Sequence, residues 1–190
     1  MLDLSPRSRL AVGIALALLM AVTRGHHFGD LNLPSASWAV FFLAGALLPA
    51  RWAFAALFLE AVALDLVAIT WGGVSDWCVT RAYGFLLPAY AVLWFAGRSY
   101  ARVHLDGWAT LGRLLSCVLA SSFVSHLLSS GGFWFFSGRY PEPTLAGFLP
   151  RIAAYYPPSL QALAFYLGIA ALLLAAGHAW AQRSSVEVSR

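Results

Sequence analysis

The chain has 190 residues, of which 61% are hydrophobic and 11% are charged, and its formal net charge is +4. In soluble domains about a quarter of all residues are charged. This composition therefore excludes an ordinary soluble domain and indicates an integral membrane protein. All 12 basic residues are arginine. In a membrane protein such an excess reports topology, so we expect membrane lipid, and no nucleic acid, among its partners.

Six apolar segments predict a single domain of six transmembrane helices over residues 1–190. Their approximate ranges are 10–23, 36–48, 52–70, 82–95, 108–128 and 160–180. About 20 apolar residues cross a bilayer, so the third, fifth and sixth segments are long enough. The others must use their flanks or be covered by protein. No alternation of the kind seen in membrane β-barrels occurs, so the expected fold class is all-α.

The arginines predict the orientation of these helices, because cytoplasmic loops carry the excess of basic residues. One side of the membrane would receive Arg7, Arg9, Arg51, Arg98, Arg102, Arg113, Arg183 and Arg190. The other side would receive Arg24, Arg81, Arg139 and Arg151. We therefore expect both termini in the cytoplasm and the connections 24–34, 71–81 and 129–158 outside.

The third outer connection is long and aromatic, with Trp134, Phe135 and Tyr140 in its first half. Its part 144–156 could form a short interfacial helix that ends at Pro157-Pro158. The aromatic side chains fit an interfacial belt. They also fit a binding segment or lid, because a loop of this length exceeds what a compact bundle needs.

Cys78 is the most reactive group of the outer connections, which also contain His26 and His27, with His126 near the outer end of the fifth segment. Thiolate and imidazole are ligands for transition metals. The spacing matches no zinc motif, however, so a metal already held in a macrocycle, which needs one or two axial ligands, fits better. The alternative is that Cys78 is simply a small buried residue.

Two acidic residues, Glu60 and Asp65, fall inside the third segment. Ionisable groups at such positions are costly and usually face a partner or a cavity. Five residues apart, they point in different directions on a helix. We expect Asp65 to orient a polar group near the site and Glu60 to pair within the bundle.

Several segments, which follow one another in the same order along the chain, resemble the BtuM family of small bacterial inner-membrane proteins. Members of this family are proposed to take up cobalamin, and they are related to the S-components of energy-coupling-factor transporters. These segments are Arg24-Gly-His-His-Phe28, residues 33–45 (LPSASWAVFFLAG), Leu59-Glu-Ala-Val-Ala-Leu-Asp65, Cys78 and residues 87–94 (LPAYAVLW). The likeness covers roughly the first hundred residues and continues to the end as hydropathy.

The resemblance implies a multi-pass S-component-like bundle that binds cobalamin in a cavity built from the outer loops. It maps the cobalt ligand onto Cys78 and makes His26 or His27, one of the two at most, a candidate for the other axial position. A thiolate on the cobalt would also promote loss of cyanide from cyanocobalamin. We expect the remaining corrinoid contacts to come from Asp65, Tyr83, Tyr90, His126, Trp134, Phe135 and Tyr140.

The resemblance further implies a coupling partner. Small residues repeat every four positions in the first segment, at Ala11 and Ala15 and at Gly13 and Ala17, and this spacing allows close helix approach. They would dock an energy-coupling transmembrane subunit with its ATPases, although internal packing explains them equally well. The sequence contains no phosphate-binding loop of its own.

A different class of function uses the same thiol. In an exosortase-like peptidase or transpeptidase, Cys78 would be the nucleophile and His126 its base, with Arg139 or Arg151 as oxyanion partner. Only the residue types support this assignment. A structural or assembly protein without a small ligand is the third alternative.

Overall fold

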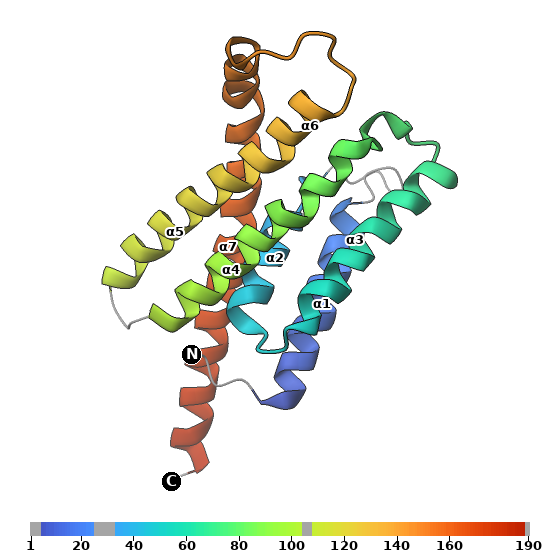
Figure 1. Cartoon of the computed structure of the whole chain (residues 1–190). Coiled ribbons are helices and arrows are strands. Elements are labelled where there is room, and N and C mark those ends of the chain that lie inside the picture. Colours follow the sequence, from blue (N-terminus) through green and yellow to red (C-terminus); the bar gives the residue numbers. More distant parts are fainter. Residues whose placement is uncertain (1–4, 25–32, 104–107, 189–190) are drawn as a thin grey trace.

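The computed structural model describes residues 5–24, 33–103 and 108–188, and all regular structure within them is helical (Figure 1). The long helices are α1 (Pro6–Arg24), α2 (Ser37–Leu47), α3 (Trp52–Thr70), α4 (Leu86–Val103), α5 (Trp108–His126) and α7 (Leu145–Val188). Two 3-10 turns, η1 (Asp76–Cys78) and η2 (Arg81–Phe85), join α3 to α4. A π-helical turn, η3 (Leu127–Gly131), and α6 (Gly132–Phe136) continue α5. The expected all-α class is confirmed.

Within the described residues, four helices are long and apolar enough to cross a membrane. They comprise residues Pro6–Arg24, Trp52–Thr70, Thr110–Phe136 and Leu145–Gly177. A helix that crosses a membrane exposes apolar side chains to lipid, and α1 does so. Its residues Leu10, Ile14 and Leu18, at four-residue intervals, are 65%, 52% and 60% exposed. Such a stripe is costly in water and favourable against lipid. The chain is therefore an all-α membrane protein.

The shortest of the long helices, α2, forms the centre of the core. Its 11 residues rise about 16 Å, roughly half of a bilayer's hydrocarbon thickness. Val40, Phe41 and Phe42 are almost completely buried, and α1, α3, α4 and α7 pack around the helix. This short segment is thus covered by protein, as its length requires.

Two glycines bring α2 and α4 into backbone contact. A Cβ atom added at Gly45 would collide with the carbonyl group of Trp94, and one added at Gly97 would collide with the carbonyl group of Phe42. The two helices can therefore approach this closely only because both positions lack a side chain.

The sixth helix differs most from the expectation. The separate interfacial helix suggested for 144–156, with its end at Pro157-Pro158, is not present: α7 runs unbroken from Leu145 to Val188 and contains the segment 160–180. A proline removes one backbone donor, but neighbouring helices can hold the chain helical through such a position. Here Tyr156 Oη lies 3.0 Å from Ser122 Oγ of α5, next to the two prolines.

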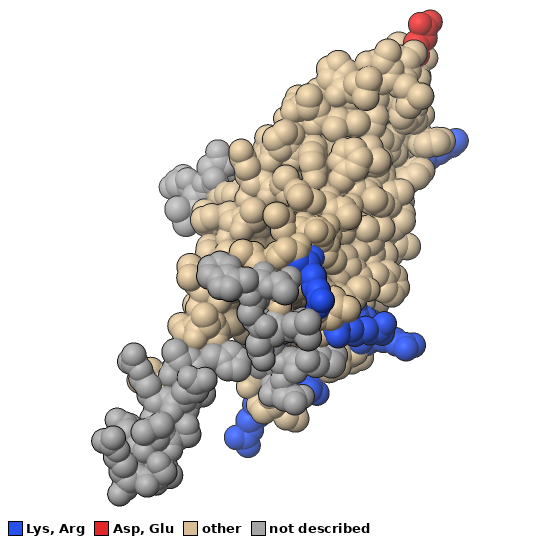
Figure 2. Space-filling model, turned by 90° about the vertical axis from the view of Figure 1, so that its left-hand side faces the viewer, with Lys and Arg blue, Asp and Glu red and all other residues tan. Residues whose placement is uncertain are grey.

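The ends of the bundle differ in charge. The beginning of α1 and the end of α7 lie at the lower end in Figure 1, and the connections 71–80 and 137–144 lie at the upper end. Figure 2 shows that most of the basic side chains of the displayed face lie over its lower half. We call the lower end of the bundle in Figure 1 the basic end and the upper end the loop end.

Candidate functional site

A cavity of about 870 Å³ lies at the loop end of the bundle. Small-molecule sites in proteins have volumes of about 300–1,000 Å³, so this one suits a large ligand. Its wall combines the 3-10 turns with the ends of α1 and α3 that lie at the loop end, the π-helical turn and the N-terminal part of α7. Segments far apart in the sequence therefore meet around one space.

Cys78 ends the 3-10 turn η1, and its side chain is exposed and lines the cavity. A hydroxyl group caps the beginning of η1 and another caps the beginning of η2. The Ser75 hydroxyl accepts a hydrogen bond from the Trp77 backbone N–H at 3.2 Å, and the Thr80 hydroxyl accepts one from the Ala82 N–H at 3.2 Å. The thiol is thus presented by a capped turn and is accessible to a ligand in the cavity.

A cation–π contact joins the Cys78 turn to the connection between α6 and α7. The guanidinium carbon of Arg139 lies 4.5 Å from the centroid of the Trp77 ring, and Trp77 itself lines the cavity. Such contacts contribute about 0.5–1 kcal/mol at exposed sites. This contact therefore links two connections without fixing them rigidly.

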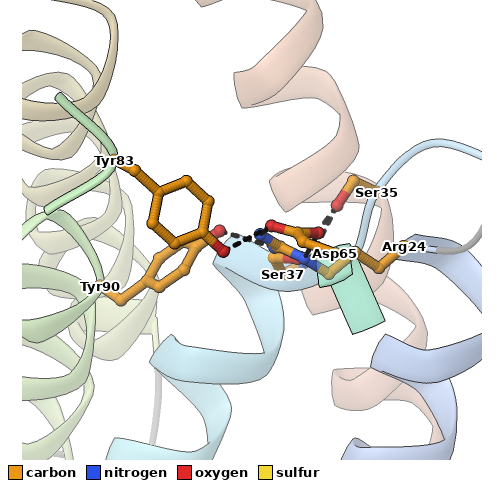
Figure 3. Close-up of polar contacts among 6 residues, drawn as sticks. All are labelled: Arg24, Ser35, Ser37, Asp65, Tyr83 and Tyr90. Carbon is orange, nitrogen blue, oxygen red and sulfur yellow. Dashed lines mark hydrogen bonds and ion pairs between the residues drawn. The ribbon is translucent and has the colours of Figure 1, made fainter. Parts of the chain in front are cut away.

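A partly buried ion pair forms the polar floor of the cavity (Figure 3). Arg24 donates from Nε and Nη2 to the two carboxylate oxygens of Asp65, each at 2.7 Å. Its Nη1 donates to Tyr90 Oη at 2.7 Å and to Ser37 Oγ at 2.9 Å. The Tyr83 hydroxyl donates to Asp65 Oδ2 at 2.7 Å. One network thus connects α1, α2, α3, η2 and α4.

The paired hydrogen bonds between Arg24 and Asp65 hold this network in one arrangement. Two parallel N–H···O bonds between arginine and a carboxylate fix both side chains, and only 12% of the Arg24 side chain and 27% of the Asp65 side chain are exposed. Burial, together with the hydrogen bond to Asp65, raises the pKa of the Tyr83 phenol above its ordinary value. A phenol is protonated at neutral pH even at its ordinary pKa, so the Tyr83 hydroxyl is a hydrogen-bond donor to Asp65.

Arg151 of α7 stands among three aromatic rings. Its guanidinium carbon lies 5.0 Å, 5.1 Å and 5.0 Å from the ring centroids of Trp134, Tyr140 and Tyr155. Trp134 Nε1 donates to the Thr144 carbonyl oxygen at 3.0 Å. Arg151 has no acidic partner within the described part of the chain, and together with Tyr140 and Tyr155 it lines the cavity. The Arg151 guanidinium is thus a cation in the cavity wall that an anionic or carbonyl group of a ligand could contact.

The π-helical turn gives the cavity two hydroxyl groups, those of Ser129 and Ser130. His126 precedes this turn and is 1% exposed. Its ring packs against Trp38 and Tyr156, with centroids 6.4 Å and 5.4 Å apart, and its Nδ1 lies 3.5 Å from Ser130 Oγ. It therefore lies behind the wall of the cavity.

The predicted site residues divide into three groups. Cys78, Asp65, Tyr83 and Tyr140 line the same cavity. Four others lie nearby without lining it: Tyr90 binds Arg24, Trp134 contacts Arg151, His126 is buried, and Phe135 lines a separate apolar cavity. His26 and His27 lie outside the described residues.

Three residues of this site escaped the sequence analysis. Arg24 served as an indicator of topology and as the first residue of a family-like segment, Arg151 as an indicator of topology and an oxyanion partner, and Tyr155 as an aromatic residue of the third outer connection. None of the three was predicted to contact the corrinoid. An arginine at the end of one span and an aspartate within another could have suggested the Arg24–Asp65 pair. Glu60, in contrast, has no hydrogen-bond or ion-pair partner among the residues the structure describes, so the pairing expected for it is not seen.

The donor set limits what kind of metal the cavity could take. Nowhere in residues 5–24, 33–103 and 108–188 do three His, Cys, Asp or Glu side chains come together as a metal site. Cys78 could thus supply one ligand to a metal that brings its other ligands with it. Neither a protein-family model nor a curated protein sequence matches the chain.

Proposed function

We propose that this protein binds cobalamin in the cavity at the loop end and takes part in its uptake across a bacterial inner membrane, with the Cys78 thiolate as an axial cobalt ligand. The observation that carries the proposal is the exposed thiol in a cavity of about 870 Å³. A corrin macrocycle already fills the four equatorial positions of cobalt. One protein ligand is then sufficient, in agreement with the single thiol.

The rest of the wall suits the same ligand. A corrinoid has a flat macrocycle, amide side chains at its edge and a phosphodiester in its nucleotide loop. The aromatic rings of Tyr140 and Tyr155 offer flat apolar surface, and Arg151 offers a cation. Tyr83 and Asp65 offer a polar floor. Apolar walls with a few fixed polar groups are the usual composition of such a site.

Thiolate ligation also accounts for a reaction with cyanocobalamin. The Cys78 sulfur would donate its electron pair to Co(III) while the cobalt–carbon bond breaks, with that bond's electron pair leaving on cyanide. The proton lost from the thiol balances the cyanide as hydrogen cyanide. Cobalt stays Co(III), so the step needs no reductant. Binding is the primary role, and decyanation accompanies it.

The proposed topology has six spans with both termini in the cytoplasm. It adds α2 and α4 to the four longer spans and places the basic end inside. Ala11 and Ala15 of α1 are exposed, so an energy-coupling subunit with its ATPases could dock there. His26 or His27 would take the second axial position on the cobalt.

The thiol peptidase alternative needs an imidazole beside the thiol. His126 is the candidate base, but it is buried against Trp38 and Tyr156 and does not line the cavity that holds Cys78. Cobalamin binding needs no such pair and is the function that the geometry supports better.

The test uses both cysteines of the chain. Wild-type protein, Cys78→Ser and Cys117→Ser would be purified, incubated with cyanocobalamin and separated from free ligand. Cys117 is a matched control because its Sγ donates to the Ala96 carbonyl oxygen at 3.4 Å between α5 and α4, away from the cavity. We expect a shifted visible spectrum and released cyanide for wild type and Cys117→Ser, and neither for Cys78→Ser.

Two results would count against the proposal. Wild-type protein that retains no corrinoid would remove the binding function itself. A bound spectrum that is identical in wild type and Cys78→Ser would leave binding intact but contradict cobalt ligation by the thiol.

A further inference from the structure

A second cavity, of about 520 Å³, lies at the basic end between the beginning of α3 and the last turns of α4. Arg51, Arg98 and Arg102 contribute three cations to its wall, and Phe54, Trp94 and Phe95 contribute aromatic surface. No acidic side chain of the described residues lines it. The proposed cobalamin function uses none of these residues.

Arg98 is held in the wall of this cavity by contacts with the chain itself. Its Nη2 donates to the Pro49 carbonyl oxygen at 2.6 Å, and its guanidinium carbon lies 5.7 Å from the centroid of the Trp94 ring. Its Nη1 is buried and has no hydrogen-bond partner within the part of the chain that the structure describes. Because protein covers this atom, the accessible cations of the cavity wall are the exposed Arg51 and Arg102.

The cavity is amphipathic along the membrane normal. Arg51 directly precedes the apolar span that begins at Trp52, so it marks the membrane surface, whereas Phe54 lies further inside. On α4, Phe95 and Arg102 are seven residues apart, which is a rise of about 10 Å. Phe95 is also 64% exposed. The cations therefore stand at the surface, with apolar walls running toward the hydrocarbon.

We propose that this cavity binds the phosphate group of an anionic phospholipid from the adjacent leaflet. Arginine forks match phosphate oxygens, and basic pockets between helices at the membrane surface bind anionic headgroups. The aromatic walls favour a lipid over free phosphate, because acyl chains would cover them. Three arginines without acidic neighbours favour an anionic lipid over a zwitterionic one.

The test compares two double variants that lose the same charge at the same end. Arg51→Gln with Arg102→Gln removes the two exposed cations of the cavity and leaves Arg98 in place. Arg7→Gln with Arg9→Gln is the control, because these residues lie on α1 and do not line the cavity. Delipidated protein in neutral detergent would be titrated with phosphatidylglycerol, phosphatidylcholine or inorganic phosphate, and lipid binding would be followed by native mass spectrometry.

We expect phosphatidylglycerol to bind wild type and the control variant with similar affinity and to bind the Arg51/Arg102 variant about thirty-fold more weakly, as for the loss of two arginines near an anionic lipid. Equal binding of phosphatidylcholine would overturn the proposal. Competition by inorganic phosphate at the same concentration would also overturn it, by identifying a soluble anion site. A control variant that loses as much affinity as the Arg51/Arg102 variant would reduce the effect to general surface charge.

Discussion

The carboxylate of Asp65 accepts hydrogen bonds from both Arg24 and Tyr83. Asp65→Asn would leave the Arg24 guanidinium without its counter-ion at a place where 12% of the side chain is exposed. Breaking a buried pair costs about 3–5 kcal/mol. Because Asp65 is 27% exposed, we expect the lower end of that range. Thermal unfolding in detergent measures the loss of stability.

Tyr83→Phe is the matched comparison, since it removes one hydrogen bond to the same carboxylate and leaves the ion pair intact. Its expected cost is about 1.5 kcal/mol, the lower end of the range for a hydrogen bond to a charged group. If Asp65→Asn proves no less stable than Tyr83→Phe, the ion pair is not what holds the floor of the cavity together.

Arg151 provides a second prediction, about ligand binding. Arg151→Gln removes the cation among Trp134, Tyr140 and Tyr155 but keeps a polar side chain. A hydrogen bond to a charged group contributes about 1.5–3 kcal/mol, so we expect cobalamin to bind about tenfold more weakly or worse, with an unchanged visible spectrum of the bound ligand. Equilibrium dialysis measures the affinity.

Arg81→Gln is the control for this prediction, because Arg81 is exposed at the same end of the bundle and does not line the cavity. Equal affinity losses in the two variants would show that only the overall charge of the loop end matters. Unchanged affinity in Arg151→Gln would remove Arg151 from the site.

At this scale the sequence alone could predict part of the candidate site. Cys78 and Tyr140 belong to connections on one side of the predicted bundle, and Asp65 belongs to a span where a carboxylate needs a partner. The partner itself could not be predicted. Arg24 and Asp65 are 41 positions apart, and their contact depends on how α1 and α3 pack and rotate.

At the scale of elements, α7 shows where local patterns mislead. Pro150, Pro157 and Pro158 all lie inside the helix, although a proline pair usually marks a helix end in water. In a membrane protein the packing partners decide, and these are known only once the bundle is assembled. The π-helical turn that places Ser130 in the cavity wall likewise has no simple sequence signal.

The backbone contact between α2 and α4 makes a third prediction. In Gly97→Ala, the new Cβ would collide with the carbonyl group of Phe42, and such overpacking costs about 1–3 kcal/mol or more. Alanine regains about 1 kcal/mol of helix propensity. Because the collision is with backbone, we expect a net loss of about 2 kcal/mol, measured as a lower temperature of unfolding in detergent.

Gly112→Ala in α5 is the control, since a Cβ at Gly112 meets no atom within 4 Å. Its stability should be unchanged or slightly higher. A Gly97→Ala protein as stable as Gly112→Ala would mean that α2 and α4 do not approach this closely.

At the scale of the whole molecule, hydropathy predicted α1, α2, α3 and α5 to within a few residues, but it missed the bounds of α4 and α7 and could not predict how the helices pack. The third segment, 52–70, matches α3 closely. Hydropathy could not show that α2 forms the core, because the same apolar residue types occur on buried helix surfaces and on surfaces that face lipid.

The proposed topology makes a fourth prediction. In a Cys117→Ser background, a membrane-impermeant maleimide added to intact spheroplasts should label Cys78, which is exposed at the loop end. Arg51→Cys, introduced at the basic end of the same protein with Cys78→Ser, should be labelled only after the membrane is opened. The reverse pattern would invert the bundle and place the cavity in the cytoplasm.

Ligation of cobalt by the Cys78 sulfur is the central claim, and X-ray absorption at the cobalt edge tests it most directly. Purified protein loaded with cobalamin should show one sulfur scatterer in the first shell of cobalt, and Cys117→Ser should show the same. Cys78→Ser loaded to the same cobalt content should show only nitrogen, oxygen and carbon. A first shell without sulfur in the loaded wild-type protein would contradict the claim.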